Sequence, residues 1–320
     1  MIKRLVIDIG GTNSRFGDCT CLSHSNFKIN QIFTIDTRHS DIHTFLDFIN
    51  VYNSHKPEIF LTFDDYESVC IAVAGPVINN ECNPPNISWN INLNNTDLNT
   101  NIVLLNDFEA QAYAFTRTEI FNDLLPIRKS KQTYKGNSAI IGAGTGLGHA
   151  LISRMTNNLN EFQIIASEAG QSGFTFTENE QEIKSFFHKK LKNNWISNDK
   201  VVSGSGLALL HEFISGEHKS PKEILKKPET DNETLSLFSR FYARACRNYC
   251  LTNAVSENLI LSGGIAAKHP YLVNNSSFFD EFENTSTHRN ILQKISICLN
   301  KNENIGLTGA LIYLFSSTHK

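Results

Sequence analysis

The apolar residues of this chain fall into short continuous runs separated by longer segments of mixed polarity. The runs predict β-strands at residues 5–9, 68–74, 102–105, 139–141, 162–165, 258–261 and 295–299, and those at 68–74 and 102–105 are expected to be buried. Apolar and small residues at helical spacing predict helices at residues 40–53, 108–117, 178–191, 233–255 and 306–315, the last of which we expect to fold back on the first part of the chain. The Asn-rich residues 79–100 are predicted to form a loop. Strands that alternate with helices indicate an α/β fold.

Two polar residues, Asn106 and Asp107, stand between the strand predicted at 102–105 and the helix after it. One interpretation is that one of them only caps the helix, because a side-chain oxygen there can accept a free backbone N–H. The other is a ligand site, because ligands of open α/β sheets collect outside the carboxyl ends of the strands. There Asp107 could orient and deprotonate a substrate hydroxyl while Asn106 holds the hydroxyl beside it.

The first predicted strand carries one polar residue, Asp8, and runs into Gly10, Gly11, Thr12 and Asn13. No helical spacing follows, so these residues predict a β-hairpin rather than a loop from strand to helix. Glycines let backbone N–H groups approach an anion, and a carboxylate such as Asp8 can hold a hydrated Mg²⁺. The alternative is a tight hairpin without a ligand.

The same pattern returns at residues 142–148, where Gly144-Thr145 matches Gly11-Thr12 at an offset of 133. Two halves of like topology, each with a glycine hairpin, would explain the repeat. A dinucleotide-binding turn needs Gly-x-Gly-x-x-Gly at the start of a helix, whereas Leu147 occupies the sixth position here and a strand is predicted next. A Walker phosphate loop is excluded because no Gly-Lys-Ser/Thr ends such a loop.

Composition adds several exclusions. The chain has 320 residues, which suits two lobes, and its 29 basic and 32 acidic residues give a net charge of −3. The sequence contains no basic cluster with interleaved aromatic residues, which is the pattern that predicts nucleic-acid binding. No stretch reaches the roughly 20 apolar residues of a membrane span, and no signal peptide precedes the first strand, so we expect a cytoplasmic protein. Its seven scattered cysteines are expected to be core thiols.

The order of the motifs resembles that of the bacterial glucokinases of the hexokinase–actin superfamily, nearly from end to end. The motifs are Asp8-Ile-Gly-Gly-Thr-Asn-x-Arg15, Gly75-Pro-Val77, Asn106-Asp-Phe-Glu-Ala110, Gly142-x-Gly-Thr-Gly-Leu-Gly148, Glu168-x-Gly170, Val202-Ser-Gly-x-Gly206, Ser262-Gly-Gly264 and Gly306-Leu-x-Gly309. The resemblance implies an α/β fold of two ribonuclease-H-like (actin-like ATPase) lobes around an interlobe cleft. We expect residues 1–106 with 306–320 in the small lobe and residues 107–305 in the large one.

The resemblance also implies roles for single residues. Asp107 would be the catalytic base at the 6-hydroxyl of a hexose, and Asn106 and Glu168 would bind the sugar. The phosphates of ATP would bind the two hairpins, with Asp8 near Mg²⁺ and the adenosine near the turn at Gly263 and Gly264. The phosphate-binding residues expected in the hairpins are Gly10, Gly11, Thr12, Asn13, Gly144, Thr145 and Gly146. A homodimer is plausible on the same ground.

Two positions depart from the family pattern, and both belong to the sugar-binding residues. Gln171 stands where the family has His in Glu-x-Gly-His, and Asp199 stands where it has Glu. A hydrogen bond to a charged group contributes about 1.5–3 kcal/mol, so a lost or lengthened bond weakens binding roughly 10- to 100-fold. Glucose is the expected substrate. The alternatives are a kinase for another hexose or an amino sugar, a non-catalytic sugar sensor of the same fold, and a nicotinamide oxidoreductase.

Overall fold

The computed structural model describes residues 2–23, 26–95, 98, 100–130, 135–155, 161–226 and 233–316. The chain folds into two compact units. Unit 1 contains Met1–Asn122 and Asn304–Lys320, and unit 2 contains Asp123–Glu303. The change from unit 1 to unit 2 therefore falls after Asn122 rather than after Asn106, the position expected from the sequence.

Unit 1 is built on a five-stranded sheet in the order β3-β2-β1-β4-β8. The first three strands form an antiparallel meander, and the last two run parallel to β1. Their bounds are β1 Ile2–Ile9, β2 Asn13–Ser23, β3 Asn26–Asp36, β4 Ser68–Val73 and β8 Asn101–Asn106. The continuous apolar runs predicted β1, β4 and β8. Strands β1 and β4 lie inside the sheet and are covered on both faces, whereas β8 is an edge strand that is buried over its last three residues.

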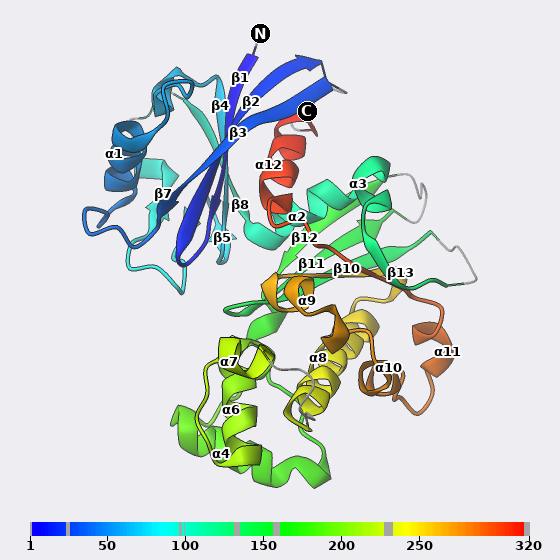
Figure 1. The fold of residues 1–320 in the computed structure, drawn as a ribbon. Helices are drawn as coiled ribbons and strands as arrows, with labels where there is room; N and C mark the ends of the chain where they lie inside the picture. The colour runs from blue at the N-terminus through cyan, green and yellow to red at the C-terminus, as the bar shows by residue number, and fades with distance from the viewer. Residues whose placement is uncertain are drawn as a thin grey trace. The chain divides into compact units, whose positions relative to one another are not determined.

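Helices cover both faces of this sheet because successive strand residues point to opposite sides (Figure 1). One face packs against α1 (Phe45–His55) through Leu5, Ile7, Ile9, Val69, Ile71 and Val73. The other packs against the C-terminal helix α12 (Ile305–Ser316) through Val6, Cys70 and Ala72. The last helix therefore does fold back on the first unit, as the sequence predicted.

Helix α2 (Asp107–Phe115) belongs to unit 1 because it packs closely on α12. At the crossing a Cβ on Gly309 would collide with the carbonyl oxygen of Ala110, so only glycine fits there. The short helix α3 (Thr118–Asn122) follows. This packing explains why the boundary between the units lies after α3 and not before α2.

The Asn-rich segment expected to be a loop contributes two strands to a small three-stranded sheet in the order β5-β6-β7, whose first strand lies just before the segment. The strands are β5 Val77–Ile78, β6 Glu81–Cys82 and β7 Ile91–Asn92, and single 3₁₀ turns lie at Phe63–Asp65 and Leu93–Asn95. A strand of two residues is too short to show the alternation of apolar and polar side chains by which strands are predicted. The sequence prediction was wrong on this point.

Unit 2 repeats the strand order of unit 1 and adds one strand, giving β12-β11-β10-β13-β14-β9. Again an antiparallel meander, β10 to β12, is followed by two strands parallel to its first member. The bounds are β9 Leu125–Arg128, β10 Asn137–Ala143, β11 Leu147–Arg154, β12 Phe162–Ser167, β13 Val255–Ser262 and β14 Ser296–Leu299. The like topology that the repeated Gly-Thr motif predicted is confirmed.

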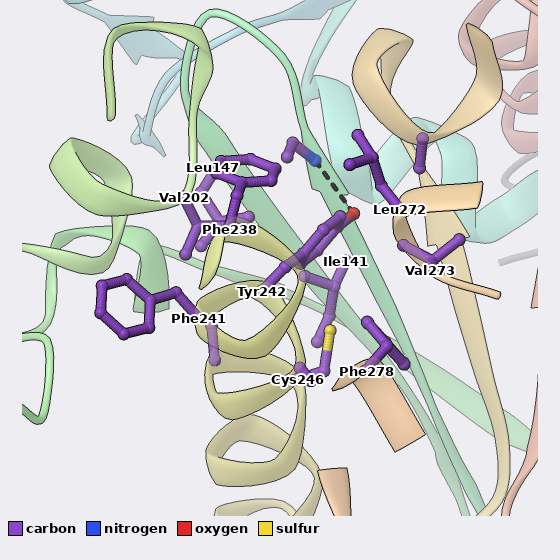
Figure 2. Packing of buried hydrophobic residues seen from close by; sticks show 14 of the residues in the cluster. Ile141, Leu147, Val202, Phe238, Phe241, Tyr242, Cys246, Leu272, Val273 and Phe278 are labelled. Atoms are coloured by element: carbon purple, nitrogen blue, oxygen red, sulfur yellow. Dashed lines mark hydrogen bonds between the residues drawn. The ribbon is translucent and has the colours of Figure 1, made fainter. Parts of the chain in front are cut away.

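One hydrophobic core joins the sheet of unit 2 to its helices, and α8 runs through it (Figure 2). The helices are α4 Gln181–Leu191, α5 Asn198–Val201, α6 Gly204–Ser215, α7 Pro221–Leu225, α8 Glu233–Thr252, α9 Gly264–Lys268, α10 Ser276–Phe282 and α11 Arg289–Leu292, with 3₁₀ turns at Ala169–Gln171, Glu178–Glu180 and Pro270–Leu272. Within this core the buried Tyr242 hydroxyl accepts the N–H of Ala143 at 3.3 Å, where β10 ends.

The start of α1 and the end of α8 differ from the prediction for local reasons. Helix α1 begins at Phe45, not at Ser40, because Thr44 and Asp47 form a capping box that fixes its start. Helix α8 ends at Thr252, before the left-handed residue Ala254 (φ 48°) leads the chain into β13. No helix in the described ranges is long and apolar enough to cross a membrane.

Candidate active site

Asn106 ends β8 and caps α2 with its side chain. Its Oδ1 accepts the N–H groups of Phe108 at 2.9 Å and Glu109 at 3.2 Å. Its Nδ2 donates to the carbonyl oxygen of Gly75 at 3.0 Å, which ties β8 to the turn after β4. The capping interpretation is thus correct for Asn106. One N–H of its amide is left to meet a ligand, and the residue is only 5% exposed.

Asp107 is the first residue of α2 and lies half-buried at the carboxyl end of β8. Its Oδ1 accepts the N–H of Phe108 at 3.0 Å, so the carboxylate is oriented by its own helix. A carboxylate in the first turn is also stabilised by the helix dipole. The structure therefore places Asn106 and Asp107 together at the strand end where ligands of α/β sheets bind.

The first glycine hairpin joins β1 to β2 as predicted. The N–H of Gly10 donates to Asn13 O at 3.1 Å, and Thr12 O accepts the N–H of Thr37 at 2.8 Å. A Cβ on Gly11 would lie 2.8 Å from the Cβ of Asn86, so the close approach of these two backbones requires glycine. Thr12 and Asn13 are exposed at the tip, where an anion could reach them.

Asp8 faces Arg15 across the antiparallel pair β1–β2, with 3.6 Å between Oδ2 and a guanidinium nitrogen. Burial raises the pKa of Asp8, and the charge of Arg15 opposes this effect. The role of Arg15 was not predicted, although the register of the expected hairpin would have placed it opposite Asp8. Among the described residues no three His, Cys, Asp or Glu side chains gather as a metal site.

The second glycine hairpin joins β10 to β11. The N–H of Gly144 donates to Gly146 O at 2.8 Å, and the N–H of Gly204, at the start of α6, donates to Gly144 O at 2.9 Å. A Cβ on Gly144 would meet nothing within 4 Å, and Thr145 is exposed, so there is open space above the hairpin. Because β11 begins at Leu147, the dinucleotide-binding alternative is wrong: a strand follows the turn.

Asp199 supports this hairpin from α5. Its Oδ1 accepts the N–H of Leu147 at 2.8 Å, and it lies so close to Gly146 that a Cβ there would collide with it. The other carboxylate oxygen lies 3.8 Å from Lys200 Nζ, and the side chain is 17% exposed. The sequence predicted Asp199 as a sugar ligand and gave no sign of its bond to the hairpin.

Glu168 and Gln171 lie on the segment that follows β12. Partial burial of the carboxyl group, and then the negative charge of Asp199, raise the pKa of Glu168, so these two acids are electrostatic neighbours. The indole Nε1 of Trp195 donates to Gln171 O at 3.1 Å, and Asn198 Nδ2 donates to Ala169 O at 3.2 Å. The expected sugar-binding residues of unit 2 therefore lie on two segments that are bonded to each other.

The turn between β13 and α9 contains Gly263 and Gly264. Gly263 has a φ of 84°, and a Cβ there would lie 2.6 Å from the carbonyl oxygen of Ala143, so the backbone alone requires glycine. A Cβ on Gly264 would meet nothing within 4 Å. The open space at Gly264, rather than the conformation of Gly263, is consistent with a ligand at this turn.

The predicted residues fall into one group on each unit. Unit 1 carries Asn106 and Asp107 at the end of β8 and, at the ends of β1 and β2, Asp8 and the hairpin Gly10, Gly11, Thr12 and Asn13. Unit 2 carries Glu168, Gln171, Asp199, the hairpin Gly144, Thr145 and Gly146, and the turn Gly263 and Gly264. Each group offers backbone N–H donors together with carboxylates. That combination suits a ligand with both phosphate and hydroxyl groups.

The family model described as Glucokinase matches residues 5–317 of this chain. The chain belongs to the glucokinase family. A curated glucokinase from Neisseria meningitidis is 27% identical over 96% of this chain and 93% of its own. Among solved structures, a glucokinase from Balamuthia mandrillaris in complex with glucose matches with a TM-score of 0.78 at 18% identity, covering 98% of this chain and 94% of that one.

A ROK-family glucokinase from Streptomyces griseus, in complex with glucose and AMPPNP, matches with a TM-score of 0.60 at 16% identity, covering 96% of this chain and 97% of that one. At these identities the structural likenesses bear on the fold alone. Together with the strand order shared by the two sheets, they confirm that this glucokinase-family chain has the expected actin-like ATPase fold, with a ribonuclease-H-like sheet in each unit.

Proposed function

We propose that this chain transfers the γ-phosphoryl group of ATP to the 6-hydroxyl of glucose, giving glucose 6-phosphate and ADP. One observation carries the proposal: Asp107 and the buried Asn106 lie side by side at the carboxyl end of β8, and their carboxylate and amide are held by hydrogen bonds of α2 and the Gly75 turn. Membership of the glucokinase family supports the same reaction. The hexose and the nucleotide named with the solved relatives agree with it.

In the proposed reaction the sugar oxygen attacks the γ-phosphorus, and the bond from that phosphorus to the bridging oxygen of ADP breaks. The proton of the hydroxyl passes to the carboxylate of Asp107. Such transfers go through a loose transition state with little covalent work for the protein, so alignment and charge stabilisation supply most of the rate. Asp107 meets the first need because Phe108 N–H fixes its orientation.

The sugar would be held by Asn106 in unit 1 and by Glu168, Gln171 and Asp199 in unit 2. In Asp199 one carboxylate oxygen is already used by Leu147 N–H, which leaves the other for a sugar hydroxyl. A Glu in its place would reach one methylene further. This division of the Asp199 carboxylate is the specific observation that favours a second candidate: a kinase with the same chemistry but a preference for another hexose or an amino sugar.

The phosphates of ATP would bind the two hairpins through backbone N–H groups. The open space above Gly144 fits such an approach, since a side chain there would fill it. Mg²⁺ usually keeps several waters and binds through one or two carboxylates plus substrate phosphates. A single carboxylate, Asp8, therefore fits the role of a partner for the hydrated ion, which would neutralise phosphate charge. Cytoplasmic location and a homodimer remain predictions.

The test is a coupled assay of ADP release with glucose, mannose, fructose and glucosamine as acceptors. We expect turnover with glucose and the highest kcat/KM for glucose. A higher kcat/KM for another sugar would replace glucose as the substrate and leave the kinase chemistry intact. If no sugar stimulates ADP release although glucose binds by calorimetry, the chain is a sensor and the proposal fails.

A further inference from the structure

A pocket of about 370 Å³ opens in unit 1 next to the first glycine hairpin. Two contacts connect its lining to the hairpin. Arg38 Nε donates to Gly11 O at 2.8 Å, and Asn86 packs on the α-carbon of Gly11. Pockets for small organic ligands begin at roughly 300 Å³, so this one is large enough for a ligand of a few atoms beyond a phosphate group.

The polar groups that line this pocket are cationic or neutral. Arg38, His39 and His43 supply a guanidinium and two imidazoles, and Ser88 and Asn86 supply hydroxyl and amide donors, whereas the Ser40 hydroxyl donates to Asp41 Oδ1 at 3.1 Å. None of the lining residues within the described chain is an Asp or Glu. Such a lining favours an anion, and a guanidinium fork matches the oxygens of a phosphate better than it matches a monatomic ion.

Arg38 is held ready for such an anion. Its Nε is used by Gly11 O, and in the described part of the chain its two terminal nitrogens have no hydrogen-bond partner. Its backbone is also fixed, since its N–H donates to Asp36 Oδ1 at 2.8 Å. The stem and one edge of the guanidinium are therefore anchored while the other edge is available to a ligand.

His39 adds a second donor of defined orientation. Its Nδ1 accepts the N–H of Asp41 at 3.3 Å, so a neutral ring carries its proton on Nε2. The carboxylate of Asp41 lies 3.8 Å from Nδ1, is 73% exposed and does not line the pocket. Buried Ile42 and half-buried Ile87 complete the wall with apolar surface.

We propose that this pocket binds a phosphate monoester, with the phosphate on Arg38 and the two imidazoles and the hydroxyl-bearing remainder toward Asn86 and Ser88. Free phosphate has the same recognition chemistry at the cationic end. The site is independent of the kinase proposal. Its effect on activity rests on the kinase proposal. Arg38 is hydrogen-bonded to Gly11 of the hairpin that is proposed to bind the phosphates of ATP. A phosphate bound to Arg38 therefore places negative charge beside that hairpin, and we expect it to raise the KM for ATP.

The binding test follows the imidazole C–H resonances of His39 and His43 in the full chain, assigned with His39→Gln and His43→Gln. Glucose 6-phosphate and inorganic phosphate are titrated separately. We expect both signals to shift with a common saturation curve. Arg38→Gln should weaken binding about tenfold or more, as the loss of hydrogen bonds to a charged group requires. The matched control is Lys184→Gln, which removes the charge of an exposed lysine in unit 2. This variant should bind both ligands as the unchanged chain does.

The outcomes separate the two sources and the two proposals. If glucose 6-phosphate binds more tightly than inorganic phosphate, the ligand of the pocket is a phosphate monoester. If glucose 6-phosphate binds equally or more weakly, the proposal of a monoester is overturned. The absence of shifts at both histidines, or unchanged affinity in Arg38→Gln, overturns the site. In activity assays His43→Gln and Ser88→Ala should keep the basal kcat and lose the effect of the added phosphate on the KM for ATP. If the chain proves inactive as a kinase, the resonance titration still decides the site.

Discussion

At the scale of single residues, Asn106 and Asp107 are neighbours with different constraints. Asn106 uses its amide oxygen for two N–H groups of α2 and one amide hydrogen for Gly75 O, so its structural role constrains the sugar-binding role that we propose for it. The bond from Phe108 N–H to Asp107 involves one oxygen of that carboxylate. A substitution at Asp107 can therefore preserve the local hydrogen bond and still remove the charge.

Asp107→Asn should lower kcat by orders of magnitude and change the KM for glucose little. An Asn retains an Oδ1 for the Phe108 N–H but cannot accept the proton of the sugar hydroxyl, and general-base catalysis contributes about 10²- to 10⁴-fold. The coupled ADP assay measures both constants. Asp64→Asn, an exposed position of the same unit, is the control and should keep full activity. Turnover of Asp107→Asn close to that of the unchanged chain would remove Asp107 from its role.

His149 is a second residue with a testable property. It lies on β11, 2% exposed, and its ring centroid is 4.7 Å from that of Tyr249. Its Nδ1 has no hydrogen-bond partner in the described structure. Burial lowers the pKa of His149 from 6.5 to about 3, so the folded chain holds this ring neutral at any pH near neutrality.

This shift predicts a loss of stability in mild acid. Below pH 6.5 the unfolded chain takes up a proton at His149 that the folded chain refuses until about pH 3, so stability is present above 6.5 and falls as the pH drops. At about pH 5 the loss is roughly 2 kcal/mol. Urea unfolding from neutral pH to pH 5 should show a smaller loss for His149→Val than for the unchanged chain. His288→Gln, at an exposed histidine, should lose as much as the unchanged chain, and parallel curves for all three would contradict the assignment.

At the scale of elements, the β10–β11 hairpin is supported by segments far from it in sequence. Gly204 at the start of α6 donates to Gly144 O, and Asp199 of α5 accepts from Leu147 N–H. The residues around Asp199 are bonded in turn to the segment of Glu168 and Gln171 through Trp195 and Asn198. In unit 2 the expected phosphate-binding and sugar-binding residues are thus parts of one hydrogen-bonded assembly.

Substitutions at Asp199 should separate its two roles. Asp199→Asn keeps an oxygen for the Leu147 N–H, so the KM for ATP should stay close to normal while the KM for glucose rises with the loss of the charge. Asp199→Ala removes both the charge and the acceptor for the Leu147 N–H, so the KM for ATP should also rise, about tenfold or more. Steady-state kinetics with each substrate varied measures the two effects. Equal effects of both variants on the KM for ATP would show that the bond to Leu147 does not support the hairpin.

The sequence predicted strands that carry mostly apolar runs, including the exposed edge strand β12, and missed strands without such runs. Strands β1, β4 and β10 lie inside their sheets and therefore carry unbroken apolar runs. Strand β3 is a sheet edge in which exposed and covered residues alternate, interrupted by a bulge against β2, so no continuous run marks it. At the site, residue types at the ends of strands were predictable. Contacts between distant segments, such as Leu147 with Asp199 or Arg38 with Gly11, depend on tertiary packing and had no signal in the sequence.

At the scale of the whole molecule, the two units have the same strand order but are connected differently. Unit 2 is one continuous stretch with its own core, while unit 1 needs the C-terminal segment to complete its fold. Helix α12 buries Leu307, Leu311, Leu314 and Phe315 against the sheet. At about 1.5–3 kcal/mol for each buried side chain, the loss of these four is comparable to the 5–15 kcal/mol that stabilise a typical domain.

Dissection of the chain should reveal this asymmetry. A fragment of residues 123–303 should fold alone and unfold cooperatively in urea, because it contains its complete sheet and core. It should show no glucose-dependent ADP release, because Asp107 lies outside it. A fragment of residues 1–122 should be unfolded or aggregated, because the sheet face that α12 covers would be exposed. Circular dichroism and size-exclusion chromatography measure both. A cooperative unfolding transition of the 1–122 fragment would show that α12 is dispensable to unit 1, and an unfolded 123–303 fragment would show that its core does not suffice.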